Sequence, residues 1–296
     1  MKLSSGLVQA VTAYAIWGLF PLYWVWLKQV PAVEVMAHRI VWSFVTLLVF
    51  MLARKRLITV VDGLKNKKML LLLTATALLI SINWLLYIWA VSNGHVLESS
   101  LGYYINPLVS VVLGMLFLGE RLRRFQYLAV LFAFVGVLFL ALMHGQIPWV
   151  ALGLAFSFAF YALLRKWVEL AAQSAMLIET GLLLMPALCY LVLVGQNNAI
   201  ISGGGFMRLL LICGGAVTLL PLILLTGALK TLPLSTIGFL QYLSPTMQFL
   251  IGLLVFNEPF DIYRGISFLL IWTGLVIYSL EALWVANKKP AVGRVK

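Results

Sequence analysis

The chain has 296 residues, of which 63% are hydrophobic and only 10% are charged, and its formal net charge is +12. Soluble domains carry about 25% charged residues, so this chain lacks the polar side chains that would cover a water-exposed surface. The composition excludes an ordinary soluble domain, and the sequence shows none of the short alternating strands of a lipid-facing β-barrel.

Apolar runs of about 18 or more residues recur along the whole chain, and each is long enough to cross a bilayer as a helix. We therefore predict an all-α membrane protein with ten transmembrane helices, joined by loops too short to hold a soluble domain. In chain order the predicted spans are 6–27, 33–53, 69–91, 98–118, 125–143, 148–167, 176–194, 207–229, 234–255 and 261–284.

The basic residues are distributed unevenly between the two sides of these spans. Ten spans place both termini on one side, and 17 of the 21 Lys and Arg residues fall on that side. The other side holds only Lys28, Arg208 and Arg264, and Arg39 lies within a span. By the positive-inside rule we expect cytoplasmic termini, with 286–296 as a basic cytoplasmic tail. The positive charge orients the protein in its membrane, so no nucleic-acid partner is expected.

The first predicted span is interrupted by residues that favour a bend. Trp17 and Gly18 lie near its middle with Pro21, and proline in a membrane helix often marks a kink. Trp24 and Trp26 lie near the end of the span, where tryptophan is typical of the interfacial aromatic belt.

The second predicted span opens with the ionisable residues Glu34, His38 and Arg39. Glu34 and His38 lie one turn apart and can interact directly, whereas Arg39 points about 140° round the helix from Glu34. An ionisable group inside a bilayer costs several kcal/mol and suggests a function. Two interpretations stay open: proton coupling or recognition of substrate charge, and structural pairing with side chains that reach back to the interface.

The fourth predicted span carries polar residues near its middle. Tyr103, Asn106 and Ser110 recur at i, i+3 and i+7, which is one face of a helix. Asn106 directly precedes Pro107, which cannot donate a backbone hydrogen bond and leaves a carbonyl one turn upstream without its usual donor. This face therefore offers both side-chain and backbone polar groups.

The pattern of the fourth span returns in the ninth, because the chain contains an internal repeat. A shift of 138 residues superimposes Tyr104 on Tyr242, Pro107 on Pro245, Gly114 on Gly252, Glu120 on Glu258 and Gly136 on Gly274. We predict two five-helix repeats, residues 5–143 and 148–285. Since five is odd, the second repeat is inverted relative to the first, as in many secondary transporters, which bind substrate near the midplane between the repeats.

Glu120 and Glu258 are related by the repeat, and Arg264 follows Glu258 closely in the sequence. We interpret Glu120 and Glu258 as forming loop or gate salt bridges.

Polar positions related by the repeat would meet around its axis and line a cavity there. Shifted by 138, the polar face of the fourth span becomes Gln241, Ser244 and Gln248. The alternative is interhelical hydrogen bonding that holds the helices together, worth about 0.6 kcal/mol per contact. The predicted cavity-lining set is Trp17, Asn83, Tyr87, Tyr103, Tyr104, Asn106, Ser110, Gln241, Tyr242, Ser244 and Gln248.

Several longer strings resemble a known family. The duplicated pattern, with LGER closing the fourth span and FNEP closing the ninth, looks like the EamA branch of the drug/metabolite transporter superfamily. The strings AYAIWGLFPLY, EVMAHRIVWSF, NWLLYIWAVSNGHVLESSLGYYINPLV and GLAFSFAFYALLRK are similar to the RarD-type proteins of that branch. Over residues 5–285, the resemblance implies a ten-helix carrier of the bacterial inner membrane with a central cavity and alternating access. It does not supply a substrate.

These observations predict a secondary transporter that exports small metabolites or drug-like molecules and is driven by protons or by exchange. The sequence contains no GxxxxGK[ST] or HExxH motif, and its histidines lack metal-ligand spacing, so we expect no enzyme, cofactor or metal. The alternatives are a flippase for a lipid-linked headgroup and a non-transporting membrane receptor or assembly factor. The partners expected are a small-molecule substrate, the lipid bilayer and protons.

Overall fold

The computed structural model describes residues 5–119, 123–144, 147–165, 167–229 and 240–288, and within these ranges every regular element is a helix. The elements are α1 (Ser5–Gly18), α2 (Phe20–Trp24), η1 (Val25–Leu27), α3 (Ala32–Ala53), α4 (Ile58–Lys65), α5 (Lys67–Ser92), α6 (Val96–Leu118), α7 (Arg124–His144), α8 (Trp149–Arg165), α9 (Ala172–Val194), η2 (Gly195–Asn197), α10 (Ala199–Ser202), α11 (Gly205–Leu229), α13 (Leu243–Leu254) and α14 (Ile262–Lys288).

Many of these helices have the length and hydrophobicity of membrane spans. Among the described residues, seven helices are long and apolar enough to cross a membrane. The bent pair of α1 with α2–η1 makes an eighth span if it is counted as one, and α8 and α13 are shorter apolar helices. Large hydrophobic side chains also face outward, as Leu71, Val192 and Leu193 do. Such an apolar surface is suited to lipid. The protein is a multi-pass, all-helical membrane protein.

The first predicted span, 6–27, is broken rather than continuous. Helix α1 ends at Gly18, and the helical segment that resumes at Phe20 is bent by 42° relative to it. Pro21 occupies the first turn of α2, where its missing N–H costs nothing because first-turn donors have no partner within the helix. The proline therefore favours a new helix start over a continuous span.

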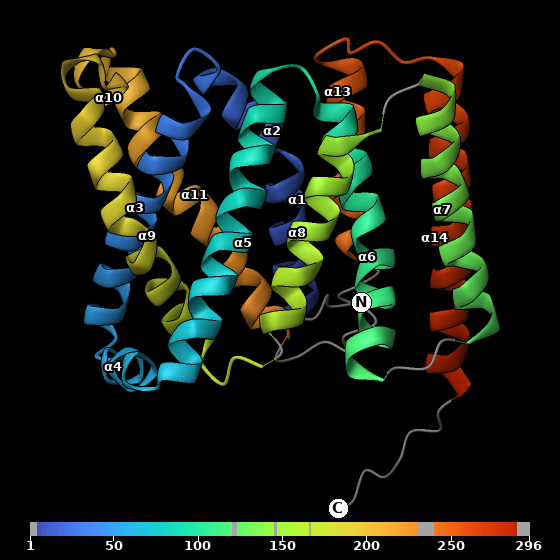
Figure 1. Ribbon diagram of the computed structural model, residues 1–296, viewed down its shortest axis with the longest axis horizontal. Helices are drawn as coiled ribbons and strands as arrows, with labels where there is room; N and C mark the ends of the chain where they lie inside the picture. The colour runs from blue at the N-terminus through green and yellow to red at the C-terminus, as the bar shows by residue number, and fades with distance from the viewer. Residues whose placement is uncertain (1–4, 120–122, 145–146, 166, 230–239, 289–296) are drawn as a thin grey trace, which may run out of the picture.

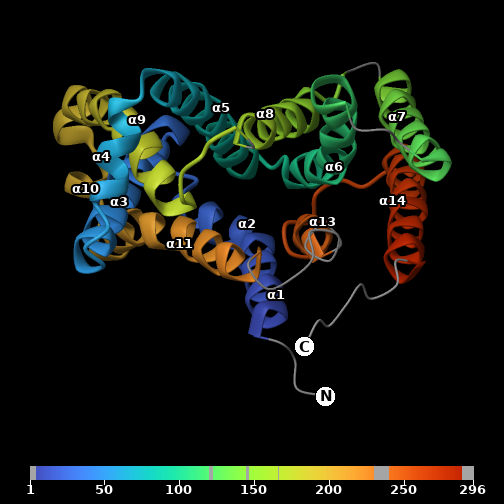
Figure 2. The ribbon, with the colours of Figure 1, turned by 90° about the horizontal axis from the view of Figure 1, so that it is seen from below.

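The long helices are arranged in two facing rows that are closed at both ends. From below, α5, α8 and α6 form one row and α11, α1 and α13 the other (Figure 2). Helices α3 and α9 close one end, and α7 and α14 pack along each other at the other end (Figure 1). Helix α6 also packs against α8 and α13, and α3 against α9 and α11. A major hydrophobic cluster lies among α2, α3 and α5, and includes Trp24 and Tyr87.

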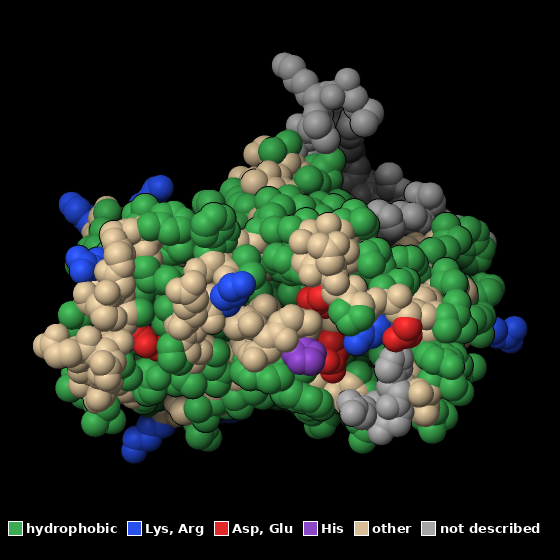
Figure 3. Space-filling model, turned by 90° about the horizontal axis from the view of Figure 1, so that it is seen from above, with side chains coloured by type: hydrophobic (Ala, Val, Ile, Leu, Met, Phe, Trp, Pro, Cys, Tyr) green, Lys and Arg blue, Asp and Glu red, His purple; other side chains and the backbone are tan. Residues whose placement is uncertain are grey.

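The connections between the long helices lie on two opposite faces of the bundle, called here the lower and the upper face. The lower face carries α4, a short helix that the sequence analysis placed in a loop, and the upper face carries α2 and α10 (Figure 1). Viewed from above, the perimeter is mainly hydrophobic, while acidic and histidine side chains lie inside the face (Figure 3).

Helix α14 continues to Lys288, three residues into the predicted tail. The predicted span 234–255 is described only from residue 240.

Candidate functional site

The side chain of Arg39 lies inside the bundle, where α3 meets α11. It is 3% exposed, and its Nε donates a hydrogen bond of 2.7 Å to Oγ1 of Thr218. The Thr218 hydroxyl uses its own hydrogen to bond the carbonyl of Gly214 at 2.8 Å, one turn earlier on α11. Its oxygen is thus fixed as an acceptor, which orients the guanidinium.

Aromatic rings from two other helices cover the Arg39 guanidinium. Its central carbon lies 4.1 Å from the ring centroid of Trp84 on α5 and 5.0 Å from that of Trp24 on α2. Cation–π contacts at these distances are attractive, and a desolvated site strengthens them. Trp24 is 1% exposed, so its interpretation as an interfacial belt residue is wrong; the bend at α2 turns it into the bundle.

The close approach of α11 to α3 depends on Gly215. A Cβ at this position would lie 2.4 Å from the backbone carbonyl carbon of Trp42 on α3. No side chain fits at that distance, so only glycine lets the two backbones meet here. This contact places Thr218, one turn further along α11, next to Arg39.

The hydrogen-bonding capacity of the Arg39 site is only partly used. Nη1 of Arg39 and the hydroxyl of Tyr87 are buried and have no hydrogen-bond partner in the described part of the chain. The rings of Tyr87 and Tyr103 lie 5.8 Å apart, and their phenol groups, with that of Tyr23, are within electrostatic range of the guanidinium. Among the described residues, no carboxylate forms an ion pair with Arg39.

A second set of predicted cavity residues, the polar cluster, lies on α1, α6 and α13. Ser110 donates to Oδ1 of Asn106 at 3.1 Å, and Gln248 donates to the carbonyl of Trp17 at 3.2 Å and to Ser244 at 3.4 Å. Nδ2 of Asn106 and Oε1 of Gln248 are buried without a partner in the described residues. Five of the predicted cavity residues thus form two bonded groups, one within α6 and one that links α13 to α1, and each group keeps a buried polar atom without a partner in the described residues.

The remaining predicted cavity residues do not belong to this cluster. Asn83 and Tyr104 already have hydrogen-bond partners, and Gln241 and Tyr242 lie outside the long helices. Asn83 donates from Nδ2 to the carbonyl of Leu154 at 3.0 Å and to Ser157 at 2.9 Å, which links α5 to α8. The hydroxyl of Tyr104 bonds Thr246 at 2.6 Å, and its ring packs edge-on against the aromatic side chains of α14. Gln241 and Tyr242 lie just before α13 and are half-buried.

Glu34 and His38 point to a different place from Arg39. Glu34 accepts the backbone N–H of Ala199 at 2.5 Å, and Nε2 of His38 bonds Oδ1 of Asn198 at 2.9 Å. The two side chains lie 3.9 Å apart. Both therefore hold the start of α10, on the upper face, and they do not share a site with Arg39.

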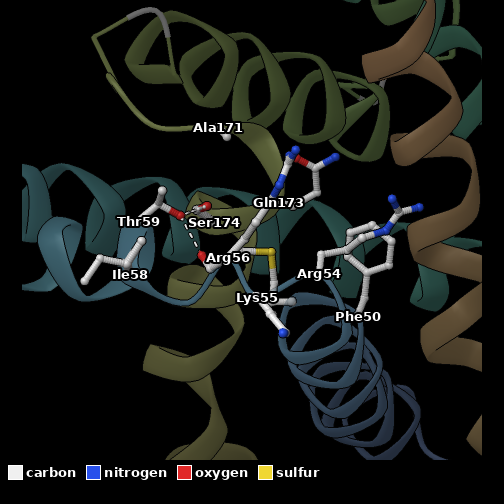
Figure 4. A pocket seen from close by; sticks show the side chains of 10 residues that line it. Phe50, Arg54, Lys55, Arg56, Ile58, Thr59, Ala171, Gln173 and Ser174 are labelled. Atoms are coloured by element: carbon white, nitrogen blue, oxygen red, sulfur yellow. Dashed lines mark hydrogen bonds between the residues drawn. The ribbon is translucent and has the colours of Figure 1, made fainter.

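A cavity of about 270 Å³ opens on the lower face beside α4 (Figure 4). Ser174 and Thr59 bond each other at 2.8 Å in its wall, and Thr59 also donates to the carbonyl of Arg56 at 2.9 Å. Gln173 lines this cavity and also a smaller one of about 40 Å³, whose lining includes Leu47 on α3 and Leu219 on α11.

The sequence analysis did not single out Thr218 or these cavities. Thr218 lies in an apolar run 179 residues from Arg39, and nothing in its local pattern indicates a partner. The available signal was Arg39 itself, because a buried cation inside a membrane protein requires polar or aromatic neighbours from other helices.

Comparisons with known proteins relate the chain to one family of transporters. Residues 4–142 match the model of the EamA-like transporter family. The protein named RarD of Escherichia coli K12 is 44% identical over 285 residues, which cover 96% of each chain. A protein named as an uncharacterized transporter in Vibrio cholerae is 44% identical over 280 residues, 94% of this chain and 93% of that one. A crystal structure with 19% identity aligns over 95% of this chain and 99% of its own with a TM-score of 0.62, which shows a shared fold.

Proposed function

Because the chain belongs to the EamA-like transporter family and is of the RarD type, we propose that it is a secondary transporter of the bacterial inner membrane. It exports small metabolites or drug-like molecules by alternating access. Several relatives are named as uncharacterized transporters, and among the described residues no group of His, Cys, Asp and Glu could hold a metal ion.

The observation that carries this proposal is the uncompensated guanidinium of Arg39 inside an apolar bundle. An ionisable group within a membrane is costly and is retained where it contacts a substrate, an ion or another charge. Arg39 has one hydrogen bond, aromatic neighbours and an Nη1 without a partner in the described residues. A static structural role would be expected to satisfy both ends of the guanidinium.

Alternating access in this fold would rest on two inverted repeats, residues 5–143 and 148–285. Helix packing supports this symmetry, since α3, α6 and α7 each pack against the helix that lies 138 residues later, namely α9, α13 and α14. Two close contacts between α7 and α14 also follow it. A Cβ at Gly136 would lie 3.0 Å from the carbonyl of Ser267, and one at Gly274 would lie 2.6 Å from the carbonyl of Ala129; both pairs are related by the same shift.

The substrate cavity in this proposal includes the polar cluster of α1, α6 and α13. Asn106 and Gln248 each keep a buried polar atom without a partner in the described residues, whereas atoms that only hold helices together would be paired. Tyr103, one turn before Asn106 on α6, packs its ring against that of Tyr87 on α5. Tyr104, Gln241 and Tyr242 flank the same helices.

Coupling to protons is assigned to His38 with Glu34. Histidine titrates between roughly pH 5 and 8, and both side chains are buried beside α10 on the upper face. Protonation of His38 would change its bond to Asn198 and thereby the hold of α3 on α10. Such a contact is suited to a gate that responds to a proton gradient.

Orientation follows from the charge distribution, with α4 and both termini in the cytoplasm. Reporters that are active only in the cytoplasm or only in the periplasm, fused after Lys296, test this directly. The cytoplasmic reporter alone should be active. An active periplasmic reporter would overturn both the orientation and the even number of spans.

Transport itself is tested with vesicles that contain a bacterial metabolite extract and either include or lack the reconstituted protein. A carrier depletes specific compounds from the protein-containing vesicles, and these compounds identify the solute. Movement of labelled lipid without depletion of any soluble compound would indicate a flippase instead. A receptor or assembly factor would leave both unchanged.

A further inference from the structure

We propose that Arg39 binds the carboxylate of the transported solute, so that the substrates are organic monoanions with an apolar or aromatic body. The proposal rests on the proposed transport function and names the chemical class of its substrate. Arg39 and Tyr87 supply the polar contacts, and Trp24 and Trp84 supply apolar surface next to them.

Charge balance is the first argument. A buried guanidinium that lacks a counter-ion is costly, and a bound anion would remove that cost. Nε of Arg39 is committed to Thr218, while Nη1 of Arg39 and the hydroxyl of Tyr87 are both unpaired among the described residues. Both groups are hydrogen-bond donors, and the two oxygens of a carboxylate could accept from them.

The charge of the site limits the solute to a single negative charge. In the described residues, the contacts of the Arg39 side chain are with the Thr218 hydroxyl and with the rings of Trp84 and Trp24. No second cation and no carboxylate is among these contacts, so one cation faces the solute. A phosphate dianion would bring a second negative charge without a second cation to meet it. The surrounding indole and phenol rings favour a body that is apolar or aromatic.

An access route from the lower face is the second, independent observation. Ser43, Leu47 and Met51 follow Arg39 along α3 at intervals of four residues, and each interval turns the direction by about 40°. Leu47 lines the small cavity and Met51 the large one. The small cavity thus meets α3 about two turns from Arg39, and Ser43, which is buried and has no hydrogen-bond partner in the described residues, lies one turn from Arg39.

The mouth of this route is positively charged. Arg54, Lys55 and Arg56 line the large cavity (Figure 4), and all three are exposed. Clustered positive charge at the entrance of a cleft raises the local concentration of anions. Under the proposed orientation this mouth faces the cytoplasm, from which an exporter takes its solute.

Binding of tritiated 3-phenylpropionate to the purified full-length protein tests the assignment. Unlabelled octanoate should compete, whereas the uncharged 3-phenylpropionamide and the cationic 3-phenylpropylamine should not. Arg39→Gln should weaken binding about 10- to 150-fold, the effect of one charged hydrogen bond. Tyr87→Phe removes only an unpaired hydroxyl, so binding should weaken about two- to tenfold while thermal stability is unchanged.

The matched control is Arg123→Gln, which removes an arginine whose partner is Glu281 at 2.7 Å and which lies outside the proposed route. It should bind the probe like the wild type. The assignment would be overturned if the amide or the amine competed as well as octanoate. It would also be overturned if Arg39→Gln and Tyr87→Phe bound the probe like the wild type, or if no carboxylate bound more tightly than about 1 mM. If Arg39→Gln does not fold, Tyr87→Phe decides.

The metabolite vesicles separate failure of this assignment from failure of the transport proposal. Loss of anionic compounds through the wild type, with slower loss through Tyr87→Phe and little or none through Arg39→Gln, supports both proposals. Loss of only neutral or cationic compounds leaves a transporter without an anion site. Identical contents with and without protein would refute transport itself.

Discussion

The carboxylate of Glu258 accepts the backbone N–H of Val96 at 2.7 Å, although the two residues are 162 positions apart. Its other oxygen accepts the N–H of Leu97 at 2.8 Å. The side chain of His95, at the N-cap of α6, makes no capping bond. A residue of the loop after α13 thus caps α6, and the ion pair of Arg264 is with Asp261 at 4.0 Å instead of with Glu258.

Replacing Glu258 should therefore destabilise the fold without directly changing substrate contacts. Glu258→Ala leaves two buried N–H groups unpaired at a helix start, and we expect a loss of about 1–3 kcal/mol in the free energy of unfolding. Glu258→Gln, which keeps one acceptor, should lose less. Thermal unfolding in detergent measures both, with the exposed Glu169→Gln as a control. A melting temperature of Glu258→Ala equal to that of the control would argue against the cap.

Gly215→Ala should separate α11 from α3. The added methyl would lie 2.4 Å from the backbone of Trp42, and backbone atoms cannot move aside cheaply, so we expect a loss of about 1–3 kcal/mol in stability. The bond from Arg39 to Thr218 should lengthen, which would weaken binding of 3-phenylpropionate as well. Gly204→Ala is the control, because no atom lies within 4 Å of the added Cβ there. Equal stability of the two variants would show that α11 adjusts freely.

Asn83 and Asn106 should respond in opposite ways to replacement by alanine. Asn83 makes two interhelical bonds, so Asn83→Ala should lower stability by about 1 kcal/mol and leave solute affinity per folded molecule unchanged. Asn106 keeps Nδ2 free of partners among the described residues, so Asn106→Ala should weaken affinity about two- to twelvefold with little effect on stability. Thermal unfolding and solute binding, measured on the same preparations, distinguish the two.

A cysteine at position 106 or 244 checks the same surface independently. After replacement of the native Cys189 and Cys213 by serine, a soluble thiol reagent should label the new cysteine, and solute should protect it. Absence of labelling from either side of the membrane would mean that this face is packed shut.

His38→Ala should abolish solute accumulation driven by a proton gradient while leaving solute exchange intact, since exchange needs no net proton movement. The matched control is Asn198→Ala, which removes the partner of His38 but no titratable group, and should retain gradient-driven accumulation. Equal loss of accumulation and exchange in His38→Ala would indicate a packing role at α10. Unchanged accumulation in the double variant Glu34→Gln, His38→Ala would end the coupling hypothesis.

The sequence alone determined the class of the protein, because the tendency of a segment to enter lipid depends on its own side chains. The apolar runs around α3, α5 and α7 are long enough to be recognised without knowledge of their neighbours. The repeat was predicted in the same way, from matching Pro, Gly and Glu residues in the one-dimensional order, and it stays a prediction. The break after Gly18 was suggested by Pro21, but its 42° angle depends on how α2 packs.

What only the tertiary structure decided is which polar groups meet. Helical geometry already separated Arg39 from Glu34 by about 140°, yet it could not show that one faces Thr218 and the other the start of α10. Those partners lie on helices more than 160 residues away in the sequence. Which residues become partners depends on contacts between helix backbones, such as the close approach at Gly215. A hydrogen bond requires two groups within about 3 Å, and the periodicity of a single helix does not specify which neighbour will supply the second group.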